Sequence, residues 1–262
     1  ADLSGGFARF LAARTFAVIS ARDPDGRLWA SPLTGPAGFL AATSPTEVLI
    51  GAAFEAGDPL RGMPAWQQVG LITVEFAARR RLRLNGMLTE AGPGRLAVEV
   101  DQAFGNCPQY IHPRILDFGG PSGPGTEPGT VRQGTSFDPA DVELIRAADT
   151  FFLGTAHPER GSDASHKGGA PGFVRVAGSR LWWPDYAGNN MFNSFGNLAL
   201  NPRAALLFID FGTGRTLHLS GTATIEWGQP GEPGEDGGTG RRVRFDLERL
   251  VSRPWRTAHD SV

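Results

Sequence analysis

Residues 71–86 read LITVEFAARRRLRLNG, and residues 206–221 read LLFIDFGTGRTLHLSG. Each segment consists of an apolar run, a turn and an alternating run, and the two match in register at an offset of 135 residues. Further upstream, residues 30–39 (ASPLTGPAGF) recur as residues 164–173 (ASHKGGAPGF), at an offset of 134 residues. Ordered matches of the same polarity indicate an internal duplication, and the pattern predicts a β-hairpin in each copy.

Each copy follows the same expected order of elements. A short helix comes first, and Asp138 and Pro139 supply an N-cap and a first-turn signal for the helix of the second copy. A long strand, a second strand, a short strand, a helix, the hairpin and a closing strand follow. The expected ranges are 4–13, 16–21, 47–51, 59–68 and 95–100 in the first copy, and 138–148, 151–156, 181–184, 190–200 and 241–256 in the second.

Five or six short strands with small helices in about 100 residues suit a small closed barrel. The expected fold is therefore mainly β with short helices, with two tandem barrels forming a pseudo-dimer in one chain. We expect a first domain at 1–116, a Gly/Pro-rich linker at 117–137 and a second domain at 138–262. The polar stretch 228–240 is expected to form the tip of a hairpin.

Composition narrows the possible partners of the 262-residue chain. Its 36 glycines and 20 prolines favour many turns. A net charge of -2 without an aromatic-rich basic patch argues against nucleic acid, and no apolar run reaches the roughly 20 residues that span a bilayer. The single cysteine, Cys107, excludes an intrachain disulfide and favours a reducing, cytoplasmic setting. The five histidines lack paired ligand spacing, so no metal site is expected.

Two segments carry a resemblance to a known family. Residues 182–193 (WWPDYAGNNMFN) and 201–208 (NPRAALLF) resemble the FMN-binding split β-barrels of the pyridoxamine 5′-phosphate oxidase-like family, and residues 104–111 (FGNCPQYI) resemble a signature of its tandem two-barrel branch. The resemblance implies FMN as cofactor, bound where two barrels meet. Of the Arg-x-x-Leu-Leu-Lys strand that binds phosphate in the oxidase, only Lys167 remains, so oxidation of vitamin B6 is not the expected activity.

The resemblance also implies where the cofactor lies. Lys167 offers a cation to the phosphate, and the asparagines that open the helix at 190–200 add free backbone N–H groups and a positive dipole end. Each residue also has a structural interpretation. Asn189 or Asn190 is an N-cap, Lys167 a solvated turn lysine, His166 a surface histidine, and Tyr186 a core aromatic residue like Trp182 and Trp183. The expected cofactor-binding residues are Ser165, His166, Lys167, Pro184, Asp185, Tyr186, Asn189, Asn190, Met191 and Asn193 from the second copy, with Cys107 and Tyr110 from the first.

The first copy has Ser31-Pro32-Leu33 where the second has Ser165-His166-Lys167, which indicates a lost phosphate site. We expect it to supply the far wall of the second copy's site, with Trp29, Ser31, Cys107, Pro108 and Tyr110 as candidates. In a strand, Arg79, Arg81 and Arg83 share one face. A solvated outer face is the favoured interpretation of this run, and an arginine reaching across the interface is the alternative.

The predicted function is that of an FMN-binding flavoprotein, and specifically an oxidoreductase acting on an unknown small substrate or electron donor. No residue is assigned a catalytic role. The alternatives are a non-catalytic flavin-binding or sensor protein, an empty barrel that serves as a structural module, and a related barrel that binds haem or a deazaflavin. Pairing of two chains into a homodimer is left open.

Overall fold

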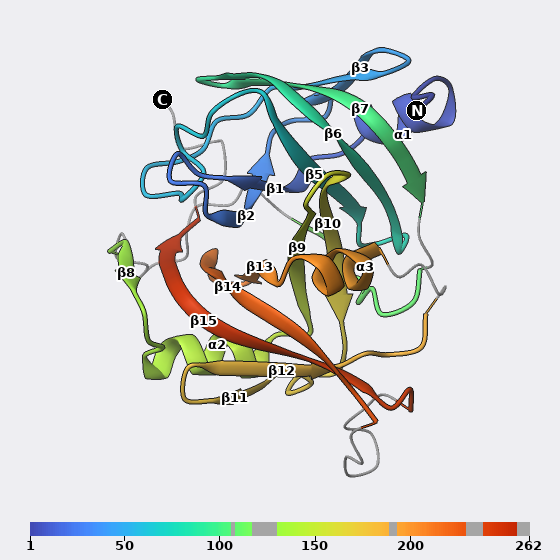
Figure 1. Ribbon diagram of the computed structural model, residues 1–262. Coiled ribbons are helices and arrows are strands. Elements are labelled where there is room, and N and C mark those ends of the chain that lie inside the picture. The colour runs from blue at the N-terminus through green and yellow to red at the C-terminus, as the bar shows by residue number, and fades with distance from the viewer. Residues whose placement is uncertain (106–107, 117–129, 189–192, 229–237, 256–262) are drawn as a thin grey trace.

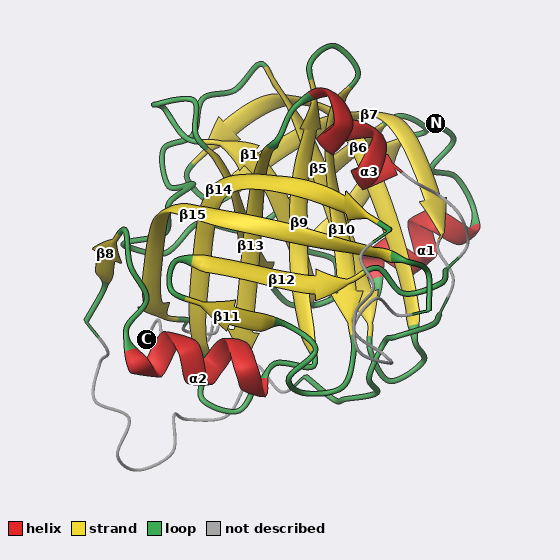
Figure 2. Ribbon diagram, turned by 60° about the horizontal axis from the view of Figure 1, so that its bottom comes forward, coloured by secondary structure: helices red, strands yellow, loops and turns green. Residues whose placement is uncertain are grey.

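A computed structural model describes residues 1–105, 108–116, 130–188, 193–228 and 238–255. The chain forms two antiparallel sheets with three short helices, which confirms the mainly-β prediction (Figures 1 and 2). None of the helices in these residues is long and apolar enough to cross a membrane.

The two sheets repeat one topology. The first has the order β2-β1-β5-β6-β7-β4-β3 and the second the order β10-β9-β13-β14-β15-β12-β11, so each strand of the first sheet has its counterpart at the same place in the second. This identity of order supports the duplication and the tandem-barrel pseudo-dimer. The first sheet comprises β1 (Phe16–Arg22), β2 (Leu28–Thr34), β3 (Leu40–Ser44), β4 (Glu47–Ile50), β5 (Gln67–Glu75), β6 (Arg80–Gly92) and β7 (Arg95–Gly105). The second comprises β9 (Thr150–His157), β10 (Gly161–Gly168), β11 (Arg175–Ala177), β12 (Arg180–Pro184), β13 (Arg203–Asp210), β14 (Arg215–Trp227) and β15 (Arg241–Pro254).

The helices follow local signals. Helix α1 (Gly6–Ala12) opens the first copy, α2 (Pro139–Ala147) opens the second, and α3 (Asn193–Leu200) precedes β13. The predicted N-cap of α2 is confirmed, because the Asp138 side chain accepts a hydrogen bond from the Asp141 backbone N–H at 2.8 Å. The Asp141 side chain accepts one from the Asp138 N–H at 3.0 Å, which completes a capping box.

Three expectations about local structure need correction. The predicted helix at 59–68 is wrong: turns occupy this segment until β5 begins at Gln67, because Gly62 within it and Gly57 just before it both adopt a φ of 81°, which no α-helix accommodates. The short strands β3 and β11 are not among the predicted strands. The segment expected to be only a linker contains β8 (Arg132–Gly134), which pairs with β15.

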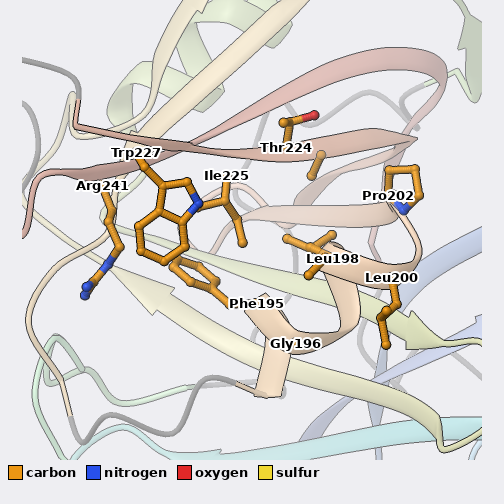
Figure 3. A pocket seen from close by; sticks show the side chains of 11 residues that line it. Phe195, Gly196, Leu198, Leu200, Pro202, Thr224, Ile225, Trp227 and Arg241 are labelled. Carbon is orange, nitrogen blue, oxygen red and sulfur yellow. The ribbon is translucent and has the colours of Figure 1, made fainter.

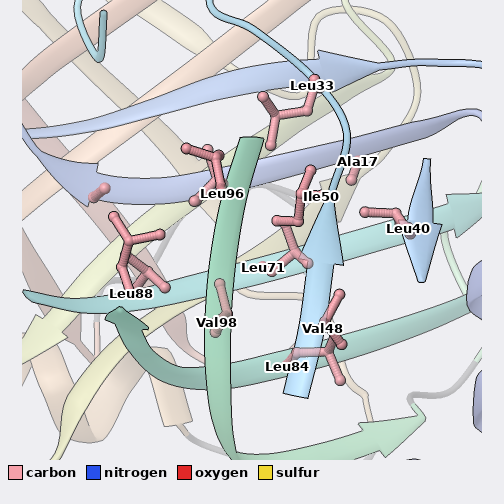
Figure 4. Close-up of a cluster of buried hydrophobic side chains, with 14 of the residues drawn as sticks. Ala17, Leu33, Leu40, Val48, Ile50, Leu71, Leu84, Leu88, Leu96 and Val98 are labelled. Carbon is pink, nitrogen blue, oxygen red and sulfur yellow. The ribbon is translucent and has the colours of Figure 1, made fainter. Parts of the chain in front are cut away.

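Each barrel has its own apolar core, and a third core joins them. In the first barrel, Leu71 and Leu84 of the central strands meet Val48, Ile50 and Val98 (Figure 4). The opposite faces of the central strands form the third core, which includes Phe16, Val18, Ile72 and Val74 of the first copy and Phe152, Ala205, Leu207 and Ile209 of the second. The central strands are therefore buried on both faces, and the copies share one continuous interior.

The strand β10 lies very close to β5. A Cβ built on Gly70 of β5 would stand 2.5 Å from the backbone nitrogen of Ala164 in β10. Only glycine permits this approach, which brings β10 against the first copy.

Candidate functional site

Strand β10 carries chemically different side chains on its two faces. Asp163, Ser165 and Lys167 share one face because side chains alternate along a strand, and Ala164 and His166 share the other. The first face meets α3 of its own copy, and the second joins the third core, with Ala164 among its members. Ser165 and Lys167 therefore belong to one site, from which His166 points away.

A hydrogen-bonded chain runs across the first face. The hydroxyls of Ser165 and Ser194 lie 3.2 Å apart, and Ser194 of α3 donates to Asp163 at 3.3 Å. Asp163 also forms an ion pair with Arg83 of β6, which comes from the first copy. Both partners of this pair are almost fully buried, with 4% of Arg83 and 2% of Asp163 exposed. These hydrogen bonds and the ion pair thus connect both copies to the start of α3.

Lys167 stands at the end of this face. Its ammonium lies 5.8 Å from the centre of the Phe195 ring. Burial lowers the pKa of Lys167; the nearby Asp185 opposes this effect, while Arg83 and Arg81 add to it. We define the interface cluster as Arg81, Arg83, Asp163, Ser165, Lys167 and Ser194. An anion placed here would oppose the effect of burial and favour the charged ammonium.

The carboxylate that most favours the charged form of Lys167 is Asp185, which follows Pro184 at the end of β12. Asp185 forms an ion pair of 2.8 Å with Arg241, and its backbone N–H donates to the Arg241 carbonyl at 3.0 Å. Asp185 is thereby held in place and its charge is offset.

His166 lies inside the third core. Its ring makes edge-to-face contacts with Phe76 and Phe152 at centroid distances of 6.2 and 5.8 Å. An Arg81 N–H donates to Nδ1 at 3.0 Å, which places the single ring proton on Nε2 because a guanidinium cannot accept. Burial and then Arg81 hold the pKa of His166 well below its usual range. His166 is therefore neutral and positions Arg81.

Two tyrosines from different copies stack on each other near the end of β10. The rings of Tyr110 and Tyr186 lie 5.1 Å apart with an interplanar angle of 20°, and the Tyr110 hydroxyl donates to the Ala187 carbonyl at 2.8 Å. The Tyr110 carbonyl lies so close to Gly168 that a Cβ there would stand 1.9 Å from it. The segment after β7 thus runs along the end of β10.

The structure brings together Ser165, Lys167, Asp185, Tyr186 and Tyr110 among the predicted residues. Pro184 is buried at the end of β12, and Asn193 is half-buried at the start of α3. Cys107, Asn189, Asn190 and Met191 lie outside the described residues. Of the expected wall residues, Trp29 belongs to the core of the first barrel, and its indole N–H donates to Asp23.

Four members of the interface cluster are not among the predicted cofactor-binding residues. These are Arg81, Arg83, Asp163 and Ser194. The expected solvated face is wrong for Arg83, which is buried against the other copy. The alternation of Arg81 with Arg83 was the available signal, and the alternative interpretation of an arginine that crosses the interface is the one the geometry supports.

The equivalent position in the other half has different chemistry. Ser31 of β2, the counterpart of Ser165, donates to Asp58 at 2.7 Å. His218 of β14, the counterpart of Arg83, lies 2.9 Å from the Ala30 carbonyl, and Asp58 lies 3.5 Å from the buried Arg253. Arg253 also pairs with Glu55. Here the chain's own charged groups pair with one another, and a leucine, Leu33, replaces the lysine.

An apolar cavity of about 800 Å³ lies on the other side of α3 (Figure 3). Phe195 and Leu198 form its floor, while Leu200 and Trp227 are largely exposed at its rim. Arg241, which holds Asp185, stands at one end. The cavity has the size and apolar lining typical of small-molecule sites, and Phe195 separates it from Lys167.

The chain is similar to known proteins over part of its length. A family model described as pyridoxamine 5′-phosphate oxidase matches residues 137–232, which include β10, the Tyr186 segment and α3. No curated protein matches the chain. Similar solved structures include HupZ of Group A Streptococcus (14% identity, 47% of this chain and 98% of that chain, TM-score 0.36) and an FAD-binding protein from Mesorhizobium loti (13%, 47% and 96%, TM-score 0.32). Another is HutZ of Vibrio cholerae, described as a heme storage protein (15%, 47% and 98%, TM-score 0.35). Residues 137–232, which make up most of the second copy, are thus similar to the pyridoxamine 5′-phosphate oxidase family.

Proposed function

We propose that the protein binds FMN at the interface cluster and acts as an FMN-dependent oxidoreductase on a small substrate. The observation that carries this proposal is the convergence of Lys167 from one copy with Arg81 and Arg83 from the other. FMN, when bound, supplies reversible uptake of a hydride or of single electrons. The family match supports the flavin as ligand, and the geometry supports the place.

The residues present fit a phosphate. Three cations of the cluster stand against two nearby carboxylates, Asp163 and Asp185, and each carboxylate already has an arginine partner. Hydroxyls of Ser165 and Ser194 add neutral donors, and Ser194 lies in the first turn of α3, where free backbone N–H groups favour anions. Lys167 is the flexible point charge that a phosphate can draw toward itself.

The ring of the flavin needs a flat surface with polar groups at its edge. We assign the stacked pair Tyr110 and Tyr186 to this role, with Pro184 and Asp185 beside the ring edge or the ribityl chain. His166, which was expected to bind the cofactor, points away from Ser165 and Lys167 and acts on the site only through its hydrogen bond with Arg81. The chain's contribution is to bind and orient the flavin, and no residue is assigned as a general acid or base.

The first experiment adds excess FMN to the purified protein, desalts the mixture and records the visible spectrum. A retained flavin spectrum is expected. A folded protein that retains none refutes the proposal, and screening with haem and a deazaflavin then identifies the other ligand classes. Anaerobic reduction of the bound flavin by a nicotinamide cofactor distinguishes an oxidoreductase from a flavin carrier.

Riboflavin sharpens the assignment of the phosphate. The wild type should bind FMN more tightly than riboflavin, which has the same ring but no phosphate. Lys167→Ala should weaken FMN binding by about 1.5–3 kcal/mol, the contribution of a hydrogen bond to a charged group, and leave riboflavin binding unchanged. Arg61→Ala, an exposed arginine of the first copy, is the matched control. Equal loss for both flavins would remove Lys167 from the phosphate site.

A further inference from the structure

A second groove lies in the first copy, away from α3. It has a volume of about 590 Å³ and lies between α1 and the turn that joins β5 to β6, at the end of β7. Phe7 and Phe10 of α1 form an aromatic wall, and three consecutive arginines, Arg79, Arg80 and Arg81, line the opposite side. The groove thus combines flat apolar surface with positive charge.

The arginines around the groove differ in their contacts. Arg14 and Arg80 share one carboxylate, Glu75, at 3.3 and 3.8 Å, and both guanidinium groups lie over the Phe10 ring at 4.5 and 5.0 Å. Arg81 points its side chain to His166. Arg79 is exposed, and within the described residues its side chain has neither an ion pair nor a hydrogen bond. Arg79 therefore stands beside the groove as an exposed cation without a carboxylate partner among the described residues.

The duplication provides an internal comparison for Arg79. This residue adopts a φ of 51°, a left-handed conformation that side chains other than glycine adopt at a cost. Its counterpart in the second copy, at the offset of the hairpin match, is Gly214, which has a φ of 69°. The same turn thus accepts the unstrained residue in one copy and carries an arginine in the other. Strain retained beside a ligand-sized groove is typical of a binding residue.

We propose that this groove is a second binding site, separate from the flavin site, for a small molecule with a flat apolar body and an anionic phosphate or carboxylate group. Phe7 contacts the flat body, and Arg79 is the primary cation for the anionic group, assisted by Arg80. A planar guanidinium suits both roles, because it pairs with oxyanions through two N–H groups and stacks on flat rings. Arg81 belongs to both the groove and the interface cluster, so the two sites adjoin.

The test titrates the full-length chain with phenyl phosphate, benzoate and uncharged benzyl alcohol by calorimetry. The wild type should bind at least one of the anions and should bind benzyl alcohol at least tenfold more weakly. Arg79→Gly should weaken anion binding at least tenfold, while its melting temperature equals that of the wild type or exceeds it by about 2 °C, because strain is relieved. Arg79→Lys should recover part of the binding, because it retains the charge.

Two further variants separate this site from others. Lys167→Ala should leave the binding of both anions unchanged, whereas probes bound at the flavin site would lose affinity in this variant. Arg61→Ala, which removes an exposed arginine elsewhere in the first copy, should bind as the wild type does. The proposal is overturned if neither anion binds the wild type, if Arg79→Gly binds like the wild type, or if Arg79→Gly lowers the melting temperature, since Arg79 would then support the fold.

Discussion

Replacement of Arg83 by leucine tests whether the copies are joined by the buried ion pair. The change leaves the Asp163 carboxylate with 2% of its surface exposed and no guanidinium beside it. Removing one partner of a buried pair costs about 3–5 kcal/mol. With an unfolding entropy of roughly 2.1 cal/mol/K per residue, a 262-residue chain loses about 5–9 °C of melting temperature.

Urea unfolding at pH 7, followed by circular dichroism, measures the loss in the free energy of unfolding, and a thermal scan measures the loss in melting temperature. The double variant Arg83→Leu/Asp163→Asn should recover about half of it, because the uncompensated charge is gone and the hydrogen bond to Ser194 is preserved. Arg95→Leu, which breaks the exposed pair with Glu90, is the control and should cost less than about 1 kcal/mol. A loss below 1 kcal/mol in Arg83→Leu, or a double variant no better than the single one, would refute the reasoning.

The remaining predictions concern pH and packing. Burial raises the pKa of Asp58 to about 6. Its contribution to stability is therefore present at low pH and is lost as the pH rises from about 4 to 6. In urea unfolding, the difference in free energy of unfolding between the wild type and Asp58→Asn should fall across that range. Burial lowers the pKa of His218 to about 3, so stability is lost as the pH falls below about 6.5, and His218→Gln should be less sensitive to acid there; a steeper acid loss than in the wild type would contradict the assignment. Gly70→Ala should lower the free energy of unfolding by at least about 1–3 kcal/mol, because a Cβ would strike the backbone of β10. Gly196→Ala, in α3 with open space around it, should raise it by about 0.5–1 kcal/mol. Equal melting temperatures for the two variants would count against the close approach of the strands.

Local signals allowed much of the fold to be predicted. The matched segments at 71–86 and 206–221 form β5–β6 and β13–β14, because their periodicity records which faces are buried. Asp138 caps α2 as expected, since an N-cap is decided within a few residues. The helix at 59–68 failed because extending the duplication to this segment overlooked Gly57 and Gly62, whose positive φ breaks a helix.

The candidate site was harder to predict, because its contacts join distant parts of the chain. The alternation of side chains along β10 is a local signal, and it suffices to separate His166 from Ser165 and Lys167. The pattern Arg81-x-Arg83 correctly indicates a common face, but only the packing of β6 on β10 shows that the other copy covers it. The pairing of Arg83 with Asp163 has no local signature at all.

Covalent fusion of the barrels has a consequence for how each half can evolve. In a homodimer of identical subunits, every substitution appears at both sites, so neither site can change alone. Here β2 and β10 occupy equivalent places but are encoded separately, and β10 has Lys167 where β2 has Leu33, with Ser31 of β2 bonded to Asp58. Division of labour between the halves follows, and a single gene can maintain an asymmetry that no symmetric assembly could hold.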